Sequence, residues 1–123
     1  MNRSDDDARR DLTRALAGAG LLAGLALLAR PGAVAAAVAP RFPRERLWIG
    51  RVLGARLLAQ HALVLAAPEA AVVRAAAAVD GLHAASMVPV LALPRYRRAA
   101  LVTGGLAAAY AVLGPAMAPP NRG

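Results

Sequence analysis

The chain has 123 residues, of which 59% are hydrophobic and only 3% aromatic. A soluble domain is typically about 45–50% apolar and usually fills its core with aromatic side chains. The apolar residues here are mainly Ala, Leu and Val with interspersed Gly, a composition that is typical of closely packed helices in lipid. Because the chain contains no Cys, disulfides, thiolate zinc sites and cysteine nucleophiles are excluded.

The formal net charge is +8, and every basic residue is Arg. These arginines gather at the ends of apolar runs and form no basic stripe interleaved with aromatic residues. A surface for single-stranded nucleic acid would need such stacking aromatics, so we expect no nucleic-acid partner. Arginines at the ends of membrane spans act instead as anchors and determinants of topology.

The first predicted span covers residues 12–29 and follows a polar tail, residues 1–11, that we expect to be mobile. Gly20 and Gly24 form a GxxxG pair, a pattern typical of helix-packing faces. The Arg-Pro-Gly sequence that follows the span stops the helix. The apolar segment 32–39 is too short to cross a membrane, so we expect a short helix lying at the interface.

The second predicted span covers residues 47–67 and follows a basic loop with two prolines, residues 40–46. Trp48 stands at its start, where an interfacial anchor is expected. Gly50 and Gly54 form a second GxxxG pair. The span also carries two Arg, one Gln and one His, an unusual polar load for a segment in lipid.

The third predicted span covers residues 70–93, after a turn at Pro68-Glu69, and contains Pro89, which should kink it. A basic loop, residues 94–98, leads to the fourth span.

The fourth span covers residues 99–118, with Gly104 and Gly105 as packing positions, and a polar C-terminal tail of residues 119–123 follows it. The sequence therefore predicts an all-α fold in one domain, a transmembrane four-helix bundle with up-down topology and a short interfacial helix after the first span.

The arginines indicate an orientation. The loops between spans 1 and 2 and between spans 3 and 4 hold more arginines, more densely, than the opposite side. The positive-inside rule then places both basic loops in the cytoplasm and both termini outside. The segment ARRDLTR before the first apolar run also resembles a twin-arginine export signal. Thr13 stands where that signal prefers an apolar residue, and three further spans would be unusual after such a signal.

One acid, Asp80, lies inside the third span and should need a partner or a purpose, because a charge at the bilayer centre costs about 2.5–3.5 kcal/mol on insertion scales. If spans 2 and 3 form an antiparallel hairpin, residues equally far from the turn at Pro68 lie at equal depth. Arg56 and Asp80 are both twelve residues from Pro68. We therefore expect an intramembrane Arg56–Asp80 ion pair, with Gln60 one turn from Arg56 and His83 almost one turn from Asp80.

This polar cluster of Arg56, Gln60, Asp80 and His83 has two interpretations. A structural pair would fix the register of the two helices, since buried pairs often specify geometry more than they stabilise. A functional pair would handle protons or a ligand.

Other chemistries receive less support from the spacing. His61 lies level with residue 75, about 12 Å along the axis from His83, so the two cannot share one haem iron. No second acid or histidine near them completes a metal set. Ser86, His83 and Asp80 are each three residues apart on one helix and drift off a single face, which disfavours a catalytic triad. We expect no cofactor and no catalytic residue.

The segments GARLLAQ (54–60), VDGLHAASM (79–87) and RRAAL (97–101) resemble a group of small actinobacterial integral membrane proteins of unknown function. That group shows GARxxxQ in one helix and VDxxHAxSM in the next. The resemblance covers roughly residues 47–113. It implies four helices in a bacterial plasma membrane and no assigned reaction. It marks, by number in this sequence, Gly54, Arg56, Gln60, Asp80, His83, Ser86 and Met87. The size and layout are more distantly similar to DoxX-type four-helix membrane proteins, some of which accompany oxidoreductases; this likeness transfers no residues.

Three functions follow as hypotheses. The first is a non-catalytic accessory or scaffold protein in the lipid bilayer, with a second copy or another membrane protein as partner; a dry, closed Arg56–Asp80 contact would favour it. The second is a proton-coupled or small-molecule transport protein that uses Arg56, Asp80 and His83; a water-filled cavity reaching Asp80 would favour it. The third is a redox accessory with a lipophilic substrate such as a quinone; an apolar cleft open to lipid and ending at His83 would favour it.

Overall fold

The computed structural model describes residues 3–120, and these residues form helices and connecting turns without a strand. Four helices are long and apolar enough to cross a membrane. The predicted all-α transmembrane four-helix bundle is confirmed, and the chain is a multi-pass membrane protein. The elements in chain order are α1 (Arg3–Ala29), α2 (Pro31–Val38), the 3-10 helix η1 (Arg44–Arg46), α3 (Leu47–Ala66), α4 (Ala70–Val90) and α5 (Arg97–Met117).

The polar N-terminal segment, which the sequence predicted as a tail separate from the first span, is part of the same helix. From Arg3 onward it forms the first turns of α1. Two acidic side chains in its first turn complement the positive helix N-terminus. Arg9 donates a hydrogen bond to the carbonyl oxygen of Ala116 at 3.2 Å, and Thr13 donates one to that of Met117 at 3.3 Å. These hydrogen bonds tie the start of α1 to the carboxyl end of α5. Residues 1–2 and 121–123, and with them Arg122 of the polar C-terminal tail, lie outside the described residues.

The short helix expected after the first span is present as α2. Pro31 occupies its first turn, where the missing backbone N–H is tolerated and the fixed φ favours a helix. Pro89 lies in the last turn of α4, which ends at Val90 instead of continuing through residue 93. Pro89 therefore lies within the last turn of the helix and not in its middle.

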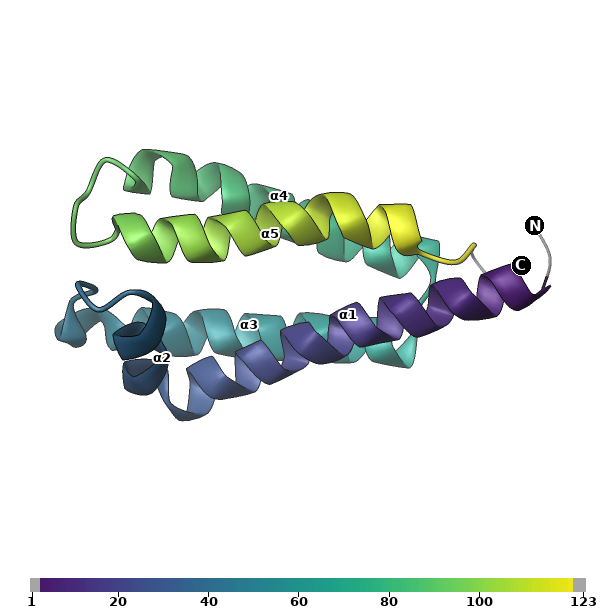
Figure 1. Ribbon diagram of the computed structural model, residues 1–123, viewed down its shortest axis with the longest axis horizontal. Coiled ribbons are helices and arrows are strands. Elements are labelled where there is room, and N and C mark those ends of the chain that lie inside the picture. Colours follow the sequence, from purple (N-terminus) through teal and green to yellow (C-terminus); the bar gives the residue numbers. More distant parts are fainter. Residues whose placement is uncertain (1–2, 121–123) are drawn as a thin grey trace.

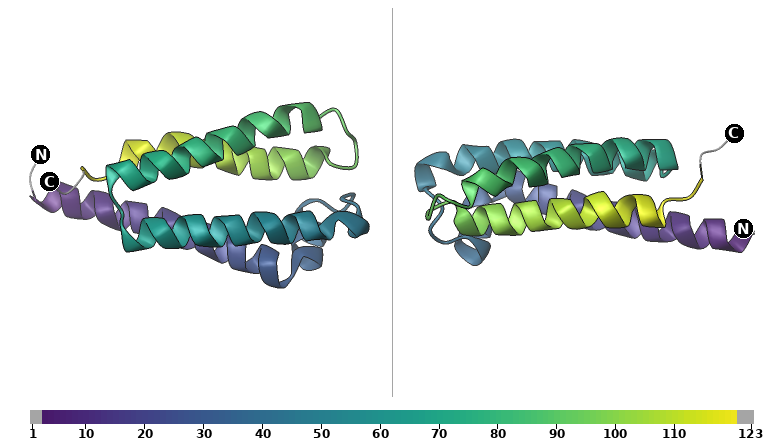
Figure 2. Two further views of the ribbon diagram at one scale, coloured as in Figure 1. Left: turned by 180° about the vertical axis from the view of Figure 1, so that it is seen from behind. Right: turned by 90° about the horizontal axis from the view of Figure 1, so that it is seen from above.

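The four spans form two layers, with α1 beside α3 in one and α4 beside α5 in the other (Figures 1 and 2). α3 and α4 are antiparallel and joined by the short turn at residues 67–69, but they do not pack tightly along their length. α1 begins and α5 ends beside this α3–α4 turn, which we call the terminal end (Figure 1). The opposite end, the basic end, holds α2 and the loops at residues 39–46 and 91–96.

Close approach of backbones at glycine holds the α1–α3 layer together. A Cβ added at Gly24 would lie 2.7 Å from the backbone nitrogen of Leu58 and 2.8 Å from the carbonyl oxygen of Gly54. A Cβ added at Gly54 would in turn lie 2.7 Å from the carbonyl oxygen of Gly24. Real Cβ atoms do not approach other atoms so closely, so only glycine fits at this crossing.

The remaining glycines predicted to pack divide into two groups. Gly20 faces the ring of His61, and a Cβ at Gly104 would lie 3.0 Å from that of Met87, which brings α5 onto α4. Gly50 has only ordinary contacts, 3.5 Å from Pro31 at the nearest. Gly105 is exposed and has no atom within 4 Å of an added Cβ. Gly105 therefore lies on the outer face of α5 and packs against no other helix of the described residues, while its neighbour Gly104 faces inward.

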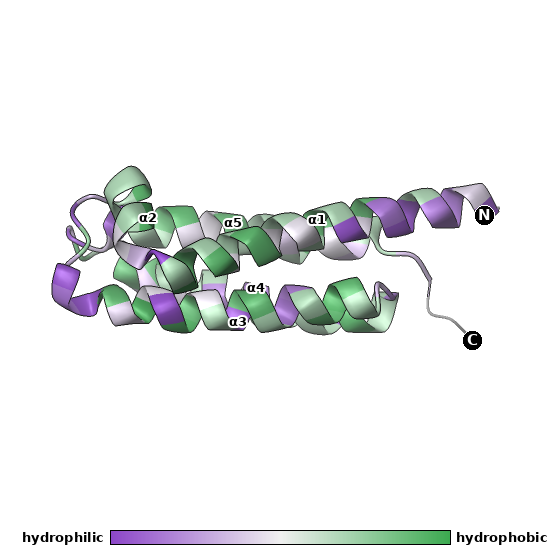
Figure 3. Cartoon of the chain, turned by 90° about the horizontal axis from the view of Figure 1, so that it is seen from below, coloured by the Kyte–Doolittle hydropathy of each residue, from purple (hydrophilic) through white to green (hydrophobic). Residues whose placement is uncertain are grey.

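The outer surface is apolar, as lipid contact requires. Large side chains on it include Leu22, Leu82 and Val112, which are 65%, 73% and 70% exposed. Hydrophilic residues gather on the first turns of α1 and at the basic end (Figure 3). This distribution explains why so few large apolar side chains are buried in the chain on its own.

The two layers contact each other at both ends of the bundle. At the terminal end a small apolar cluster of Ala17, Val64, Val73 and Ala118 joins them. At the basic end three contacts cross between the layers. Arg98 donates a hydrogen bond to the carbonyl oxygen of Val38 at 2.7 Å, Phe42 meets Tyr96 edge to face with ring centroids 5.4 Å apart, and Arg95 lies 3.7 Å from Glu45.

Candidate functional site

A cavity of about 670 Å³ lies between the two layers. All four spans and α2 contribute to its walls, which are mostly Ala, Leu and Val. On α3 its lining runs from Leu47 at the basic end to His61, fourteen residues or about 21 Å along the axis. The volume falls within the range of small-molecule pockets, about 300–1,000 Å³. The cavity therefore reaches from one end of the bundle to about the middle of the spans.

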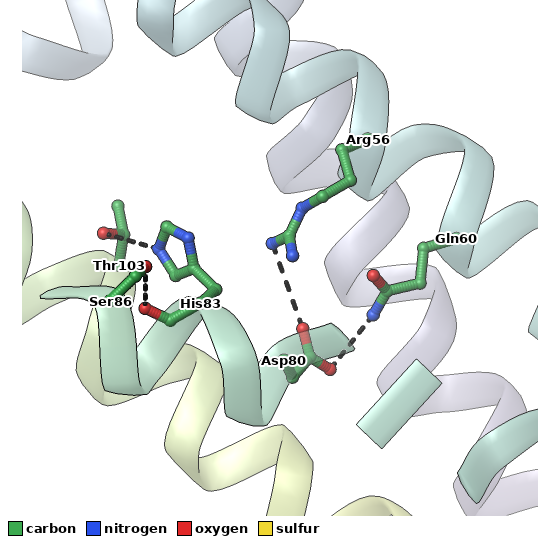
Figure 4. Close-up of polar contacts among 6 residues, drawn as sticks. All are labelled: Arg56, Gln60, Asp80, His83, Ser86 and Thr103. Carbon is green, nitrogen blue, oxygen red and sulfur yellow. Dashed lines mark hydrogen bonds and ion pairs between the residues drawn. The ribbon is translucent and has the colours of Figure 1, made fainter. Parts of the chain in front are cut away.

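Arg56 and Asp80 line the deep part of this cavity, and Gln60 joins them beside it. Figure 4 shows the contacts among the three side chains. Arg56 and Gln60 are one turn apart on α3 and so share a face. Gln60 Nε2 donates a hydrogen bond to Asp80 Oδ2 at 3.0 Å, and Arg56 Nη2 lies 4.0 Å from Asp80 Oδ1. The structure brings Arg56 close to Asp80, the two residues that the hairpin register placed at one depth, and adds Gln60 from one turn along α3.

Arg56 is poorly satisfied for a charge in the middle of a span. Its side chain is 28% exposed and lines the cavity, whereas that of Asp80 is 4% exposed. The 4.0 Å contact exceeds hydrogen-bond distance and is the sole polar contact of the guanidinium group with residues 3–120. Its Nε is buried without a partner among these residues. Arginine offers five N–H donors, so most of its hydrogen-bonding capacity is available.

His83 lines the same cavity, but its side chain turns to α5 instead of joining the other three residues (Figure 4). Its Nε2 lies 3.1 Å from the hydroxyl oxygen of Thr103. That hydroxyl donates its single proton to the carbonyl oxygen of Ala99 at 2.9 Å, so it accepts from His83. His83 Nε2 therefore carries the proton, and Nδ1 is left as an acceptor. No described residue hydrogen-bonds to Nδ1.

His61 is part of the site, although the sequence reasoning placed it away from the cluster. Its side chain is buried with 3% exposure, and it lines the cavity together with Asp80. The ring contacts that of Tyr110, with centroids 5.0 Å apart and an interplanar angle of 57°. The Tyr110 hydroxyl donates to the carbonyl oxygen of Leu16 at 2.7 Å. The sequence carried one signal for this, since His61 directly follows Gln60 in a span of unusual polarity.

Two further marked residues have local roles. The Ser86 hydroxyl donates to the backbone carbonyl oxygen of His83 at 2.7 Å and not to its ring, which leaves no relay among Ser86, His83 and Asp80. Met87 packs against Gly104. Within residues 3–120, no group of three or more His, Cys, Asp or Glu side chains is placed to hold a metal ion.

No protein-family model, curated protein or solved structure matches the chain. An apolar cavity ends at a positive guanidinium group with open donors, a buried carboxylate and a histidine acceptor. Such a site suits a molecule with an apolar body and a polar head.

Proposed function

We propose that the protein binds a small lipophilic molecule with a polar head in the cavity between its two layers. One observation carries this proposal: a mostly apolar cavity of about 670 Å³ is lined at its deep end by Arg56, Asp80 and His83, which we call the polar floor. The protein has no catalytic activity of its own in this proposal and acts as a membrane accessory, for example beside a redox enzyme with a lipophilic substrate.

The geometry of the ion pair favours binding over a purely structural role. A pair that only fixed helix register would be closed and dry, with short hydrogen bonds. Arg56 instead stands 4.0 Å from Asp80 and is partly exposed to the cavity. The mostly apolar walls also disfavour a water-filled path for ions.

Access from the lipid supports a lipophilic ligand. Ala19, Ala23 and Ala26 on α1 line the cavity and are exposed, as is Leu106 on α5, which is 55% exposed. Lining residues that are also exposed indicate an opening between α1 and α5. A molecule dissolved in the bilayer can reach the polar floor through this opening without crossing the aqueous phase.

The location that we propose is a bacterial plasma membrane, with the basic end in the cytoplasm and the terminal end outside. The arginines of the basic end and the resemblance to small actinobacterial membrane proteins support it. Because the chain lacks Cys, single Asp7→Cys and Glu45→Cys variants report topology directly. A membrane-impermeant maleimide should label the first variant in intact cells and the second only after lysis. The reverse pattern would invert the orientation.

Photolabelling tests the binding proposal. Hexadecanol with a diazirine in its chain is added to membranes that contain the protein, and labelled residues are mapped by mass spectrometry. We expect labelling of cavity residues such as Val90 and Leu106 that excess unlabelled hexadecanol displaces. Labelling of Leu82, which is 73% exposed on the outer face, should not be displaced.

A matched pair of variants controls this experiment. Ala23→Phe/Ala26→Phe obstructs the opening, whereas Ala15→Phe/Ala29→Phe makes the same change at exposed positions outside the cavity lining. The first variant should lose displaceable labelling and the second should keep it. If labelling is confined to outer residues, or if both variants behave alike, the cavity is not a binding site.

A further inference from the structure

We propose that the molecule held in this cavity is a long-chain carboxylic acid, with Arg56 binding its carboxyl group and His83 Nδ1 accepting its proton. This inference rests on the proposed binding function and names the ligand class of the same site. It follows from the hydrogen-bonding groups that face the cavity, from their charges and from the length of the apolar walls.

Arg56 lacks hydrogen-bond acceptors for most of its N–H donors. Its guanidinium group has open N–H donors, and its sole ion pair with a described residue is 4.0 Å long. A planar carboxyl group matches the guanidinium fork and can accept two parallel hydrogen bonds. An alcohol or an ester offers a neutral acceptor without that paired geometry.

His83 offers the ligand a hydrogen-bond acceptor at Nδ1. Because Thr103 fixes the proton on Nε2, Nδ1 offers a lone pair. In Figure 4 this second ring nitrogen faces the space that Arg56 also enters. The floor therefore presents donors and an acceptor together. A carboxylic acid carries the complement, a carbonyl oxygen that accepts and an O–H that donates.

The net charge of the site favours a neutral acid over a carboxylate. Arg56 and Asp80 together are neutral, so a carboxylate arriving alone would leave one uncompensated negative charge in the middle of the bilayer, which is costly. A neutral acid avoids this cost. When it binds, its O–H bond breaks, the electron pair stays on the carboxylate beside Arg56, and an N–H bond forms at His83 Nδ1. The site and ligand together remain neutral.

The other groups near the floor are either hydrogen-bonded or buried. Gln60 Oε1 and His61 Nε2 have no partner among the described residues, but both atoms are buried, whereas His83 Nδ1 is not among the buried unpartnered atoms. Asp80 Oδ2 accepts from Gln60 on α3. The unpartnered Nε2 edge of the His61 ring, also on α3, is packed against Gly20 of α1. The Tyr110 hydroxyl on α5 donates to the carbonyl oxygen of Leu16 on α1. His83 Nδ1 on α4 is consequently the open position for the proton of the ligand.

The walls suit a single long chain. On α4, Met87 and Val90 follow His83 along the cavity, and Leu93 in the turn after α4 extends the wall. Val90 is seven residues beyond His83, or about 10 Å along the axis. A chain lying against these residues would keep its carboxyl group at the floor.

Competition distinguishes the ligand classes. Hexadecanoic acid with a diazirine in its chain labels the protein in membranes, and unlabelled hexadecanoic acid, hexadecanol or methyl hexadecanoate competes. We expect the acid to compete at about tenfold lower concentration or less, because a hydrogen bond to a charged group is worth about tenfold or more in affinity. Equal competition by all three would overturn the acid class and leave the proposed cavity binding intact. Absence of displaceable labelling by either probe would overturn both.

Variants assign the roles of the two residues. Arg56→Gln should reduce the preference for the acid to the level of the alcohol, while Arg51→Gln, an exposed arginine of the same helix outside the cavity lining, should keep it. If Arg56→Gln does not accumulate, Arg56→Lys keeps the charge without the fork and should lower the preference. An unchanged preference in either Arg56 variant would refute the assignment.

Infrared spectroscopy reports the proton itself. With carboxyl-¹³C hexadecanoic acid bound to the protein, the label should show a carboxylate band. In His83→Leu the bound acid should show the band of the protonated carboxyl group. A protonated band in the unaltered protein, or a carboxylate band in both proteins, would overturn the role of His83.

Discussion

Replacing Gly24 by Ala should weaken the bundle at the crossing of α1 and α3. The new Cβ would lie 2.7 Å from the backbone nitrogen of Leu58 and 2.8 Å from the carbonyl oxygen of Gly54, whereas ordinary carbon contacts are about 3.5–4.0 Å. Because both obstacles are backbone atoms, no side chain can turn away. The helices must separate by roughly 1 Å, which loosens their packing along several turns.

The magnitude follows from two opposing effects. Overpacking costs about 1–3 kcal/mol, with this backbone clash at the upper end. Exchange of Gly for Ala inside a helix contributes about 1 kcal/mol in the other direction. We therefore expect Gly24→Ala to lower the free energy of unfolding by about 1–2 kcal/mol. Gly105→Ala meets no atom within 4 Å and should instead raise it by up to about 1 kcal/mol.

The measurement is a titration with sodium dodecyl sulfate in mixed micelles, followed by circular dichroism. The double variant Gly24→Ala/Gly54→Ala adds a second test. Since the two residues share one contact, its loss of stability should be smaller than the sum of the two single losses. If Gly24→Ala unfolds like Gly105→Ala, or if the two losses simply add, the glycine crossing does not hold the layer together.

Three further outcomes are expected. Asp80→Asn should reduce accumulation of folded protein in the membrane, because it leaves Arg56 without its counter-charge. The double variant Asp80→Asn/Arg56→Gln should restore accumulation. A double variant that accumulates no better than Asp80→Asn would show that the two charges do not interact. Gly20→Ala should lower the detergent midpoint because its Cβ meets the ring of His61, and adding His61→Ala should recover most of the loss; no recovery would place the clash elsewhere. Tyr110→Phe removes one partly buried hydrogen bond to α1 and should cost about 1 kcal/mol in the same titration, with an unchanged midpoint contradicting that role.

The sequence was sufficient to predict the membrane spans and to place the central charges, Arg56 and Asp80, at equal depth. Uninterrupted apolar runs with arginines at their ends identify membrane helices because lipid leaves no other way to satisfy the backbone. A short turn between two helices then sets equal depths by counting, which is why Arg56 and Asp80 meet. Depth alone does not say which helices pack, and α3 lies mainly on α1 while α4 lies on α5.

The sequence could not predict which helices pair, because the helices carry Ala and Gly on several faces. Gly104 and Gly105 are neighbours with the same chemistry, but Gly104 faces Met87 and Gly105 faces outward. Periodicity cannot choose between faces that are all small and apolar. The turn of His83 toward Thr103 followed from the α4–α5 pairing, so it could not be predicted before that pairing was known.

The same composition that marks a membrane protein also accounts for the cavity. The glycine crossing brings α1 and α3 so close that no side chain separates them, and Gly104 draws α5 onto α4. Large side chains could fill the space between the resulting layers, but the chain has one Phe, one Trp and two Tyr. Phe42 and Tyr96 meet at the basic end, Tyr110 lies at the floor, and Trp48 is 57% exposed. The middle is left to small and aliphatic residues, and a ligand with its own long apolar chain would supply the packing that the protein omits.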